Sequence, residues 1–420
     1  MSMPFGFGAP DGGGFDMNAL GAALQRFGQM LQQGGDEGPV RWSMVSDVAR
    51  TTVNQRGDAL AVDASWIDET MRLADLWLDS ATDFPAHGGQ PRAWSRQDWL
   101  SETLDSWRPI IEPIAQHMQG LTANLPGAEL TTPEDLSAAL PEQLRAMLPD
   151  GAIPAELMSM LTPMLGMVQQ LGAAAFSMQL GQALGTLATE VLSSTDIGIP
   201  LGVVGVPAIV TRNVDELVAG LPIPQADVRL FVALREGAHQ RLFMHVPWLR
   251  PRLIGAIEEY AKGLRLDHSR VQEALGQIDP SDPQALQSVM ASGVLEPPTS
   301  PEQQAALARI ETLLALVEGW VDDVVDQAIA GRLATHDALR ETLRRRRAEG
   351  GPAERAFGTL VGLTMRPKAM REAATIFQGL RSMKGSAARD GIWEHPDFLP
   401  GSDDLTEPMD FLARLADDSE

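Results

Sequence analysis

The chain of 420 residues contains 44% hydrophobic and 21% charged side chains, a composition typical of a globular protein with a substantial core, and this excludes wholesale disorder. Its 33 basic and 56 acidic residues give a net charge of −23, which disfavours nucleic acid and anionic membrane surfaces as partners. The absence of cysteine excludes disulfides and thiolate chemistry, so His and carboxylate side chains would have to hold any metal ion.

Residues 1–17 are rich in Gly and lack the basic start and apolar run of a signal peptide, so we expect a flexible N-terminus. The segment 157–189 carries no charge, but glutamines interrupt it and no run of about 18 apolar residues remains. It therefore predicts a buried helix and not a membrane span. A cytoplasmic protein without membrane association is the expectation.

Residues 18–122 are predicted to form an N-terminal helical region. Apolar side chains recur there at helical spacing, and Ser95 followed by Asp98 predicts a helix start with a capping pair. Six tryptophans lie between Trp42 and Trp107. Bulky aromatic residues on a helical pattern usually fill a core, so we expect a packing role for them and not a ligand cage.

Residues 123–410 are predicted to form a larger helical domain, followed by an acidic tail at 411–420. Gly181 and Gly185 have the spacing that lets two helices approach closely. The segment 197–210, which reads IGIPLGVVGVPAIV, is the best candidate for β structure, and helical patterns resume after it. The expected fold class is therefore mainly α, with a small β or extended element.

The segment 230–250 reads LFVALREGAHQRLFMHVPWLR and contains REGAH, one substitution away from the zinc motif H-E-x-x-H. In that motif two histidines on one helix face bind zinc, and the Glu takes a proton from the metal-bound water. Glu236 matches the base and His239 the second ligand, but Arg235 occupies the position of the first ligand. Arginine stays protonated in proteins and cannot bind zinc, so a polar structural cluster is the alternative to a metal site.

His245 lies ten residues after Arg235, where the extended form of the motif has its third histidine. The glycine that makes the turn in that form is Leu242 here. A continuous helix would point His245 away from His239, so we expect His245 to be a ligand only if the helix breaks.

Glu318 and Asp322 are four residues apart on a helix predicted for residues 302–331. This spacing fits a zinc-binding Glu and an Asp that orients a histidine ligand. Asp326 extends the row by another four residues, as a solvated acidic helix face would also do. Both interpretations remain open at the level of sequence. The arginine run 344–347 fits a helix C-terminus, where cations are favourable, better than it fits an anion site.

Four segments together resemble an actinobacterial family of zincin-like metallopeptidases, whose members are usually labelled hydrolases or zinc-dependent metalloproteases. They are REGAHQRLF with HVPWLR, LVEGWVDDVVD, GGPAERAFGTLVGLTMRPKAMREA and WEHPDFLP, and the likeness extends from about residue 20 to residue 410. The resemblance implies a mostly helical zincin-like fold with Glu236 as general base, His239 as a zinc ligand and Glu318 as the third ligand.

Two functions follow as hypotheses. In the first, the protein is a metal-dependent hydrolase acting on peptides, with zinc held by His239, Glu318 and one further ligand, while Glu236 is the base and Arg235 stabilises an oxyanion. In the second, it is an inactive zincin-derived pseudoenzyme, a helical scaffold that binds a protein or peptide. Arg235 then pairs with Glu236 or Glu318, and no metal binds.

Overall fold

The computed structural model describes residues 38–57, 60, 62–86, 88–123, 155–263, 300–348 and 367–417. The structure does not describe the predicted Gly-rich N-terminus or residues 124–154, 264–299 and 349–366. The boundaries proposed from sequence at residues 17, 122 and 410 remain predictions.

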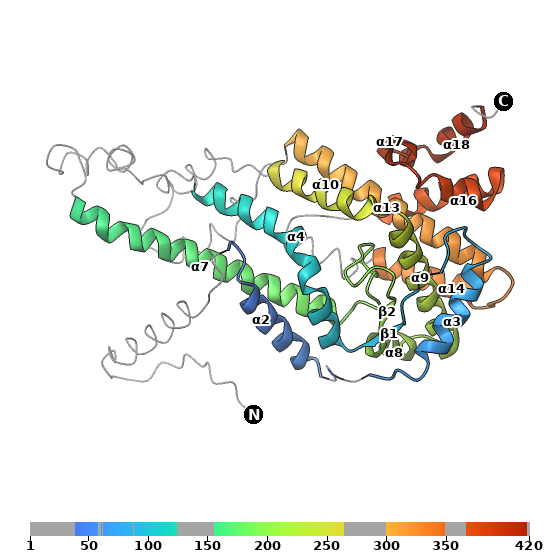
Figure 1. The fold of residues 1–420 in the computed structure, drawn as a ribbon, viewed down its shortest axis with the longest axis horizontal. Coiled ribbons are helices and arrows are strands. Elements are labelled where there is room, and N and C mark those ends of the chain that lie inside the picture. The colour runs from blue at the N-terminus through green and yellow to red at the C-terminus, as the bar shows by residue number, and fades with distance from the viewer. Residues whose placement is uncertain are drawn as a thin grey trace.

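The described chain is mainly helical, as predicted, with two very short strands (Figure 1). In chain order its elements are α2 (Trp42–Gln55), α3 (Ile67–Leu78), β1 (Arg92–Trp94), α4 (Arg96–Ala123), α7 (Ala155–Ala188), β2 (Ala208–Val210), α8 (Thr211–Ala219), α9 (Gln225–His245), α10 (Leu249–Gly263), α13 (Pro301–Ile329), α14 (His336–Ala348), α16 (Pro367–Gly391), the short 3-10 helix η2 (Pro396–Phe398), α17 (Ser402–Thr406) and α18 (Pro408–Asp417). None of the described helices is long and apolar enough to cross a bilayer.

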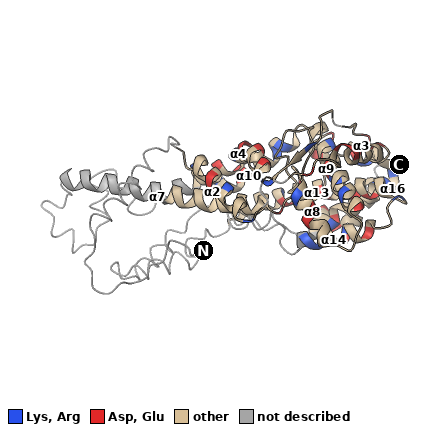
Figure 2. Cartoon of the chain, turned by 90° about the horizontal axis from the view of Figure 1, so that it is seen from below, with Lys and Arg blue, Asp and Glu red and all other residues tan. Residues whose placement is uncertain are grey.

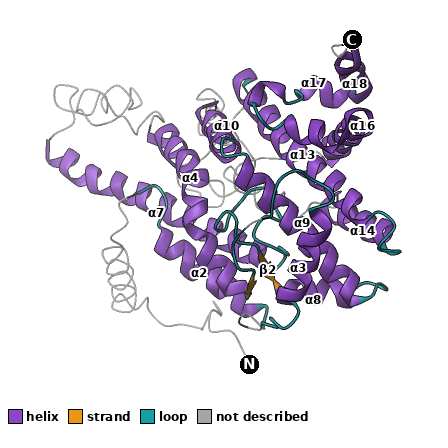
Figure 3. Ribbon diagram, turned by 45° about the vertical axis from the view of Figure 1, so that its right-hand side comes forward, coloured by secondary structure: helices purple, strands orange, loops and turns teal. Residues whose placement is uncertain are grey.

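Helix α13 is central, because it packs against α9, α10 and α16, while α3 covers another side of α9 (Figure 3). Every residue of α9 from Leu230 to Phe243 is buried, and α13 is buried almost continuously from Leu313 to Val325. A polar side chain on either helix must therefore find its partner inside the protein. Five of the six tryptophans between Trp42 and Trp107 are buried in the core, and Trp77 packs against its edge.

The two strands form a small parallel sheet in which Ile209 is paired with Ala93. Only Ala208–Val210 of the predicted β segment is strand. The rest is irregular because Gly198 and Gly205 adopt positive φ angles, which end an extended chain. Strand β1 has only three residues, too few to show an alternating pattern in the sequence.

The predicted start of α4 is confirmed by its capping contacts. The Ser95 hydroxyl accepts a hydrogen bond from the Asp98 amide at 3.0 Å, and the Asp98 carboxylate accepts one from the Ser95 amide at 2.8 Å. These bonds satisfy backbone donors that a helix start leaves free. They fix the end of β1 against α4, and through the sheet they also fix β2.

The predicted close approach of the glycines is confirmed on α7, which packs against α2. A Cβ atom built on Gly185 would lie 2.6 Å from Thr52 Cβ and 2.8 Å from the carbonyl oxygen of Ala49. A Cβ on Gly181 would meet Val48 and Val45 just as closely.

Gly185→Ala should therefore lower the free energy of unfolding by about 2 kcal/mol, because overpacking forces two backbones apart. Gly172→Ala on the same helix is the matched control, since nothing lies within 4 Å of its Cβ position. It should be neutral or stabilise by up to ~1 kcal/mol through helix propensity. Chemical denaturation of both variants measures the difference, and equal effects would contradict the close contact.

Candidate active site

Arg235 projects from α9 onto α13 and binds two carboxylates there. Its Nη2 lies 2.5 Å from Glu318 Oε2, and its Nη1 lies 2.5 Å from Asp322 Oδ1. Burial alone would lower the pKa of Arg235, but Asp322 and Glu318 raise it above its ordinary value. The guanidinium is a permanent cation that bridges two turns of α13.

His239 contacts the same glutamate from the next turn of α9. Its Nδ1 lies 2.8 Å from the carbonyl oxygen of Arg235, which can only accept, so Nδ1 carries the hydrogen. Its Nε2 lies 3.2 Å from Glu318 Oε1. In the neutral ring Nε2 has a lone pair, so a proton or another cation is needed between it and the carboxylate. The histidine thus has the tautomer of a zinc ligand, and one of its predicted partners lies beside it.

Glu236, the predicted base, points elsewhere and is fully buried. Its Oε1 accepts hydrogen bonds from the Ser194 hydroxyl at 2.6 Å, the Gln240 amide at 2.9 Å and the Ala208 backbone amide at 3.1 Å. Its Oε2 accepts one from the Thr195 hydroxyl at 2.5 Å. These four donors, three on Oε1 and one on Oε2, compensate the buried charge and fix the orientation of the side chain. Glu236 therefore holds β2, and the turn before it that contains Ser194 and Thr195, against α9.

The same turn closes over the Glu318 carboxylate. Gly198 has a φ of 76°, and a Cβ atom built on it would lie 3.3 Å from Glu318 Oε1. Asp196, also in this turn, accepts a hydrogen bond from the Leu192 amide at 3.0 Å. His239 and Glu318 are consequently enclosed by the protein's own chain.

His245 ends helix α9, which continues to it without a break. Its Nδ1 faces the carbonyl oxygen of Arg241 at 2.8 Å, and its ring stacks on Phe84. Six residues along a helix rotate the side chain by about 240°, which points it away from His239. The structure does not supply the helix break that His245 would need to join the site.

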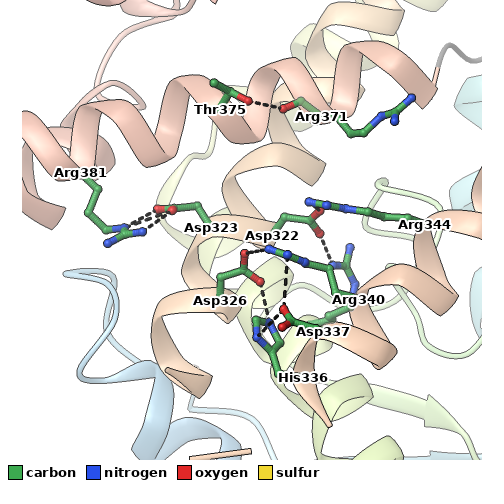
Figure 4. Close-up of polar contacts among 11 residues, drawn as sticks. Asp322, Asp323, Asp326, His336, Asp337, Arg340, Arg344, Arg371, Thr375 and Arg381 are labelled. Carbon is green, nitrogen blue, oxygen red and sulfur yellow. Dashed lines mark hydrogen bonds and ion pairs between the residues drawn. The ribbon is translucent and has the colours of Figure 1, made fainter. Parts of the chain in front are cut away.

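A second polar network lies nearer to the surface than Arg235 and connects α13 to α14 (Figure 4). Asp326 accepts from His336 Nε2 and from Arg340 Nη1, both at 2.7 Å. Asp322 Oδ2, on the carboxylate that binds Arg235, lies 3.3 Å from Arg344 Nη2. Arginines and a histidine thus pair with the acidic row that the sequence suggests.

Sequence reasoning did not identify Ser194, Thr195 and Gln240 as members of the site. The signals are weak: Gln240 lies one helical turn after Glu236, and the two hydroxyl residues belong to a short polar run before the apolar β segment. Only the fold brings residues 194 and 195 to α9.

Comparisons with known proteins agree with this architecture. The sequence profile of the zincin-like metallopeptidase family matches residues 40–412. A crystal structure from Chloroflexus aurantiacus, described as a "putative hydrolase with a novel fold", is similar with a TM-score of 0.60 and 16% identity, covering 90% of this chain and 99% of that one. At this identity the likeness shows the fold alone. No curated protein matches the chain significantly in sequence.

The residues present do not fit the zinc ion that such a family implies. A zinc site needs at least three protein ligands, and among the described residues no group of three His, Asp or Glu side chains could hold a metal. His239 and Glu318 could supply two ligands. Arg235 occupies the motif position of the remaining ligand, the first histidine, and hydrogen-bonds the carboxylate that zinc would use.

Glu236→Gln tests whether this residue is structural. The variant keeps the shape but loses the charge and turns an NH2 group towards donors, so the free energy of unfolding should fall by about 3 kcal/mol. Glu259→Gln is the control, because Glu259 is half exposed and pairs with Arg309 at the surface. Its effect should stay within about 0.5 kcal/mol. Equal or greater stability of the Glu236 variant, measured by denaturation, would point to an unsatisfied catalytic carboxylate instead.

The contacts of Asp326 lead us to expect that the attachment of α14 to α13 weakens at acid pH. Burial raises the pKa of Asp326, but the hydrogen bond from His336 and the charge of Arg340 outweigh burial and lower the pKa below the ordinary 3.8. A lowered pKa contributes stability above about pH 4 and loses it as the pH falls through the folded-state value. Asp326→Asn should therefore flatten the dependence of unfolding free energy on pH between about 5 and 3. The prediction would be contradicted if the wild type and Asp326→Asn showed the same dependence of unfolding free energy on pH.

Proposed function

Because the chain belongs to the zincin-like metallopeptidase family, and because Arg235 lies where its motif requires a zinc ligand, we propose that the protein is a zincin-derived scaffold that binds a protein or peptide without hydrolysing it. The observation that carries the proposal is the pair of 2.5 Å contacts from Arg235 to Glu318 and Asp322. They place a permanent cation at the carboxylates of the predicted metal site.

Two further features support the loss of catalysis. Glu236 is fully buried and held by four donors from Ser194, Thr195, Ala208 and Gln240, so it has no contact with solvent water from which it could take a proton. His239 and Glu318 are enclosed, whereas a catalytic zinc site keeps an open position for water and substrate. Each feature independently opposes the peptidase reaction.

A polypeptide is the partner class that the family supports, because a peptidase fold is shaped to receive an extended chain. Apolar side chains near the site remain on the surface: Val203 is 60% exposed and Met244 is 45% exposed. Met244 also lies close to Gly205 in the loop that leads to β2.

The rival function is a metal-dependent hydrolase acting on peptides. Its support is the family itself and the 3.2 Å approach of His239 to Glu318. It requires a third ligand that replaces or displaces Arg235. Metal content therefore separates the two functions before any substrate is known.

The test is the zinc content of chelator-free protein, measured by mass spectrometry for the wild type, Arg235→His and Arg235→Gln. We expect no stoichiometric zinc in the wild type. Arg235→His restores the complete H-E-x-x-H sequence next to Glu318, so it should gain zinc and a higher melting temperature on zinc addition. Arg235→Gln is the matched control, because it also removes the cation but adds no ligand of comparable affinity.

Stoichiometric zinc in the wild type that disappears in His239→Ala would overturn the scaffold proposal and establish the hydrolase. A wild type without zinc, combined with zinc in Arg235→His, would show that one residue separates this site from a metal centre.

A further inference from the structure

Helix α14 carries the arginine run, and its side chains face carboxylates of α13 and the turn before β2. Figure 2 marks in blue and red where the basic and acidic residues lie along the backbone of α14 and of the helices around it. Arg340 pairs with Asp326 and Arg344 with Asp322. Arg346 donates to the carbonyl oxygen of Glu190, and its Nη1 lies 3.8 Å from Asp196.

The apolar contact of α14 is small by comparison. Among the side chains described for residues 336–346, the buried ones are Leu339 and Leu343. At its N-terminal end His336 packs near Phe231 of α9 and binds Asp326. Two buried leucines give the helix a small apolar contact, and the ion pairs of Arg340 and Arg344 add to its attachment.

These pairs lie on a path from the surface to the enclosed histidine. The exposed fraction of the side chain is 31% for Arg344, 14% for Asp322, 9% for Arg235, 4% for Glu318 and 2% for His239. Each of these side chains contacts the next one in the series. Arg344 is therefore the outermost group above the buried cluster.

We propose that α14 is a lid held by ion pairs, which closes the route to His239 and Glu318 and lifts as a unit when Arg340 and Arg344 lose their carboxylates. Such pairs are partly exposed, so salt weakens them, whereas the more deeply buried pairs of Arg235 between α9 and α13 are screened much less. The lid concerns access to the site and holds whether or not the site binds a metal.

The absence of cysteine makes the lid measurable, because an introduced cysteine is the only thiol in the chain. Leu339→Cys places a thiol beneath α14, and Ala315→Cys places one in the buried face of α13 as a reporter of global unfolding. The rate of reaction with a thiol reagent is measured for each in three full-length backgrounds: wild type, Arg340→Ala with Arg344→Ala, and Arg345→Ala. Arg345 is the matched control, since it is 73% exposed and pairs with Glu341 of the same helix.

The lid predicts that the thiol beneath α14 reacts roughly tenfold faster in the double variant than in the wild-type background, a change of about 1.4 kcal/mol in opening. Raising the salt concentration from about 0.05 to about 0.5 M should also make this thiol react faster in the wild-type background. The thiol on α13 should keep its rate throughout, and Arg345→Ala should leave both rates unchanged.

Either of two results would overturn the lid. The first is an unchanged reaction rate of the α14 thiol in the double variant, because the ion pairs would then not hold the helix closed. The second is a parallel rise in the rate of the α13 thiol, because the whole fold would then be opening.

Discussion

The bridge from Arg235 to Glu318 and Asp322 is the interaction on which the organisation of the site depends. A buried guanidinium cannot escape its desolvation cost by losing its proton, so it must be met by carboxylates. Glu318 in turn has His239 on its other oxygen, and Asp322 has Arg344. Removal of the buried Glu318 leaves Arg235 without one of its two buried counter-charges, and the loss of a buried partner typically costs about 3–5 kcal/mol. The pairs therefore fix the relative position of α9, α13 and α14 more strictly than apolar packing alone would.

Helix α13 can hold these pairs because its opposite side is anchored separately. Asp323 binds Arg381 and Arg389 of α16, and the Trp320 indole donates to Asp390 at 2.8 Å. Gly319 lies where a Cβ atom would come within 2.6 Å of Ala373, which lets α16 pack closely. The Gly and Trp between Glu318 and Asp322, unusual for a solvated helix, are thus explained by packing against α16 and by a buried hydrogen bond.

Sequence patterns were sufficient for the local features of this fold and insufficient for its long-range ones. The helices, the capping of α4 and the close approach at Gly181 and Gly185 follow from spacing and residue type within a short window. The meeting of residue 236 with residues 194, 195 and 208 requires the chain to return to α9 through an irregular segment, and periodicity carries no information about that path. For the acidic row, the sequence offered the pairing of Arg235 with Glu318 as one alternative, and that pair is present. The arginines and the histidine that bind Asp322 and Asp326 were inaccessible, because carboxylates spaced four residues apart form the same pattern whether water, a metal ion or arginine faces them.

The arrangement also shows why a partly retained motif is weak evidence for the chemistry of the complete one. Glu236 is needed here because four donors, from Ser194, Thr195, Ala208 and Gln240, would be buried without an acceptor in its absence. His239 is needed because it fills the space between a carbonyl oxygen and Glu318. Both residues therefore have structural reasons to stand where a zinc peptidase would have its base and ligand. The first residue of the motif decides between the two chemistries. A histidine there would add a lone pair that can bind a metal ion, whereas the arginine adds a positive charge that already pairs with the carboxylates of the cluster.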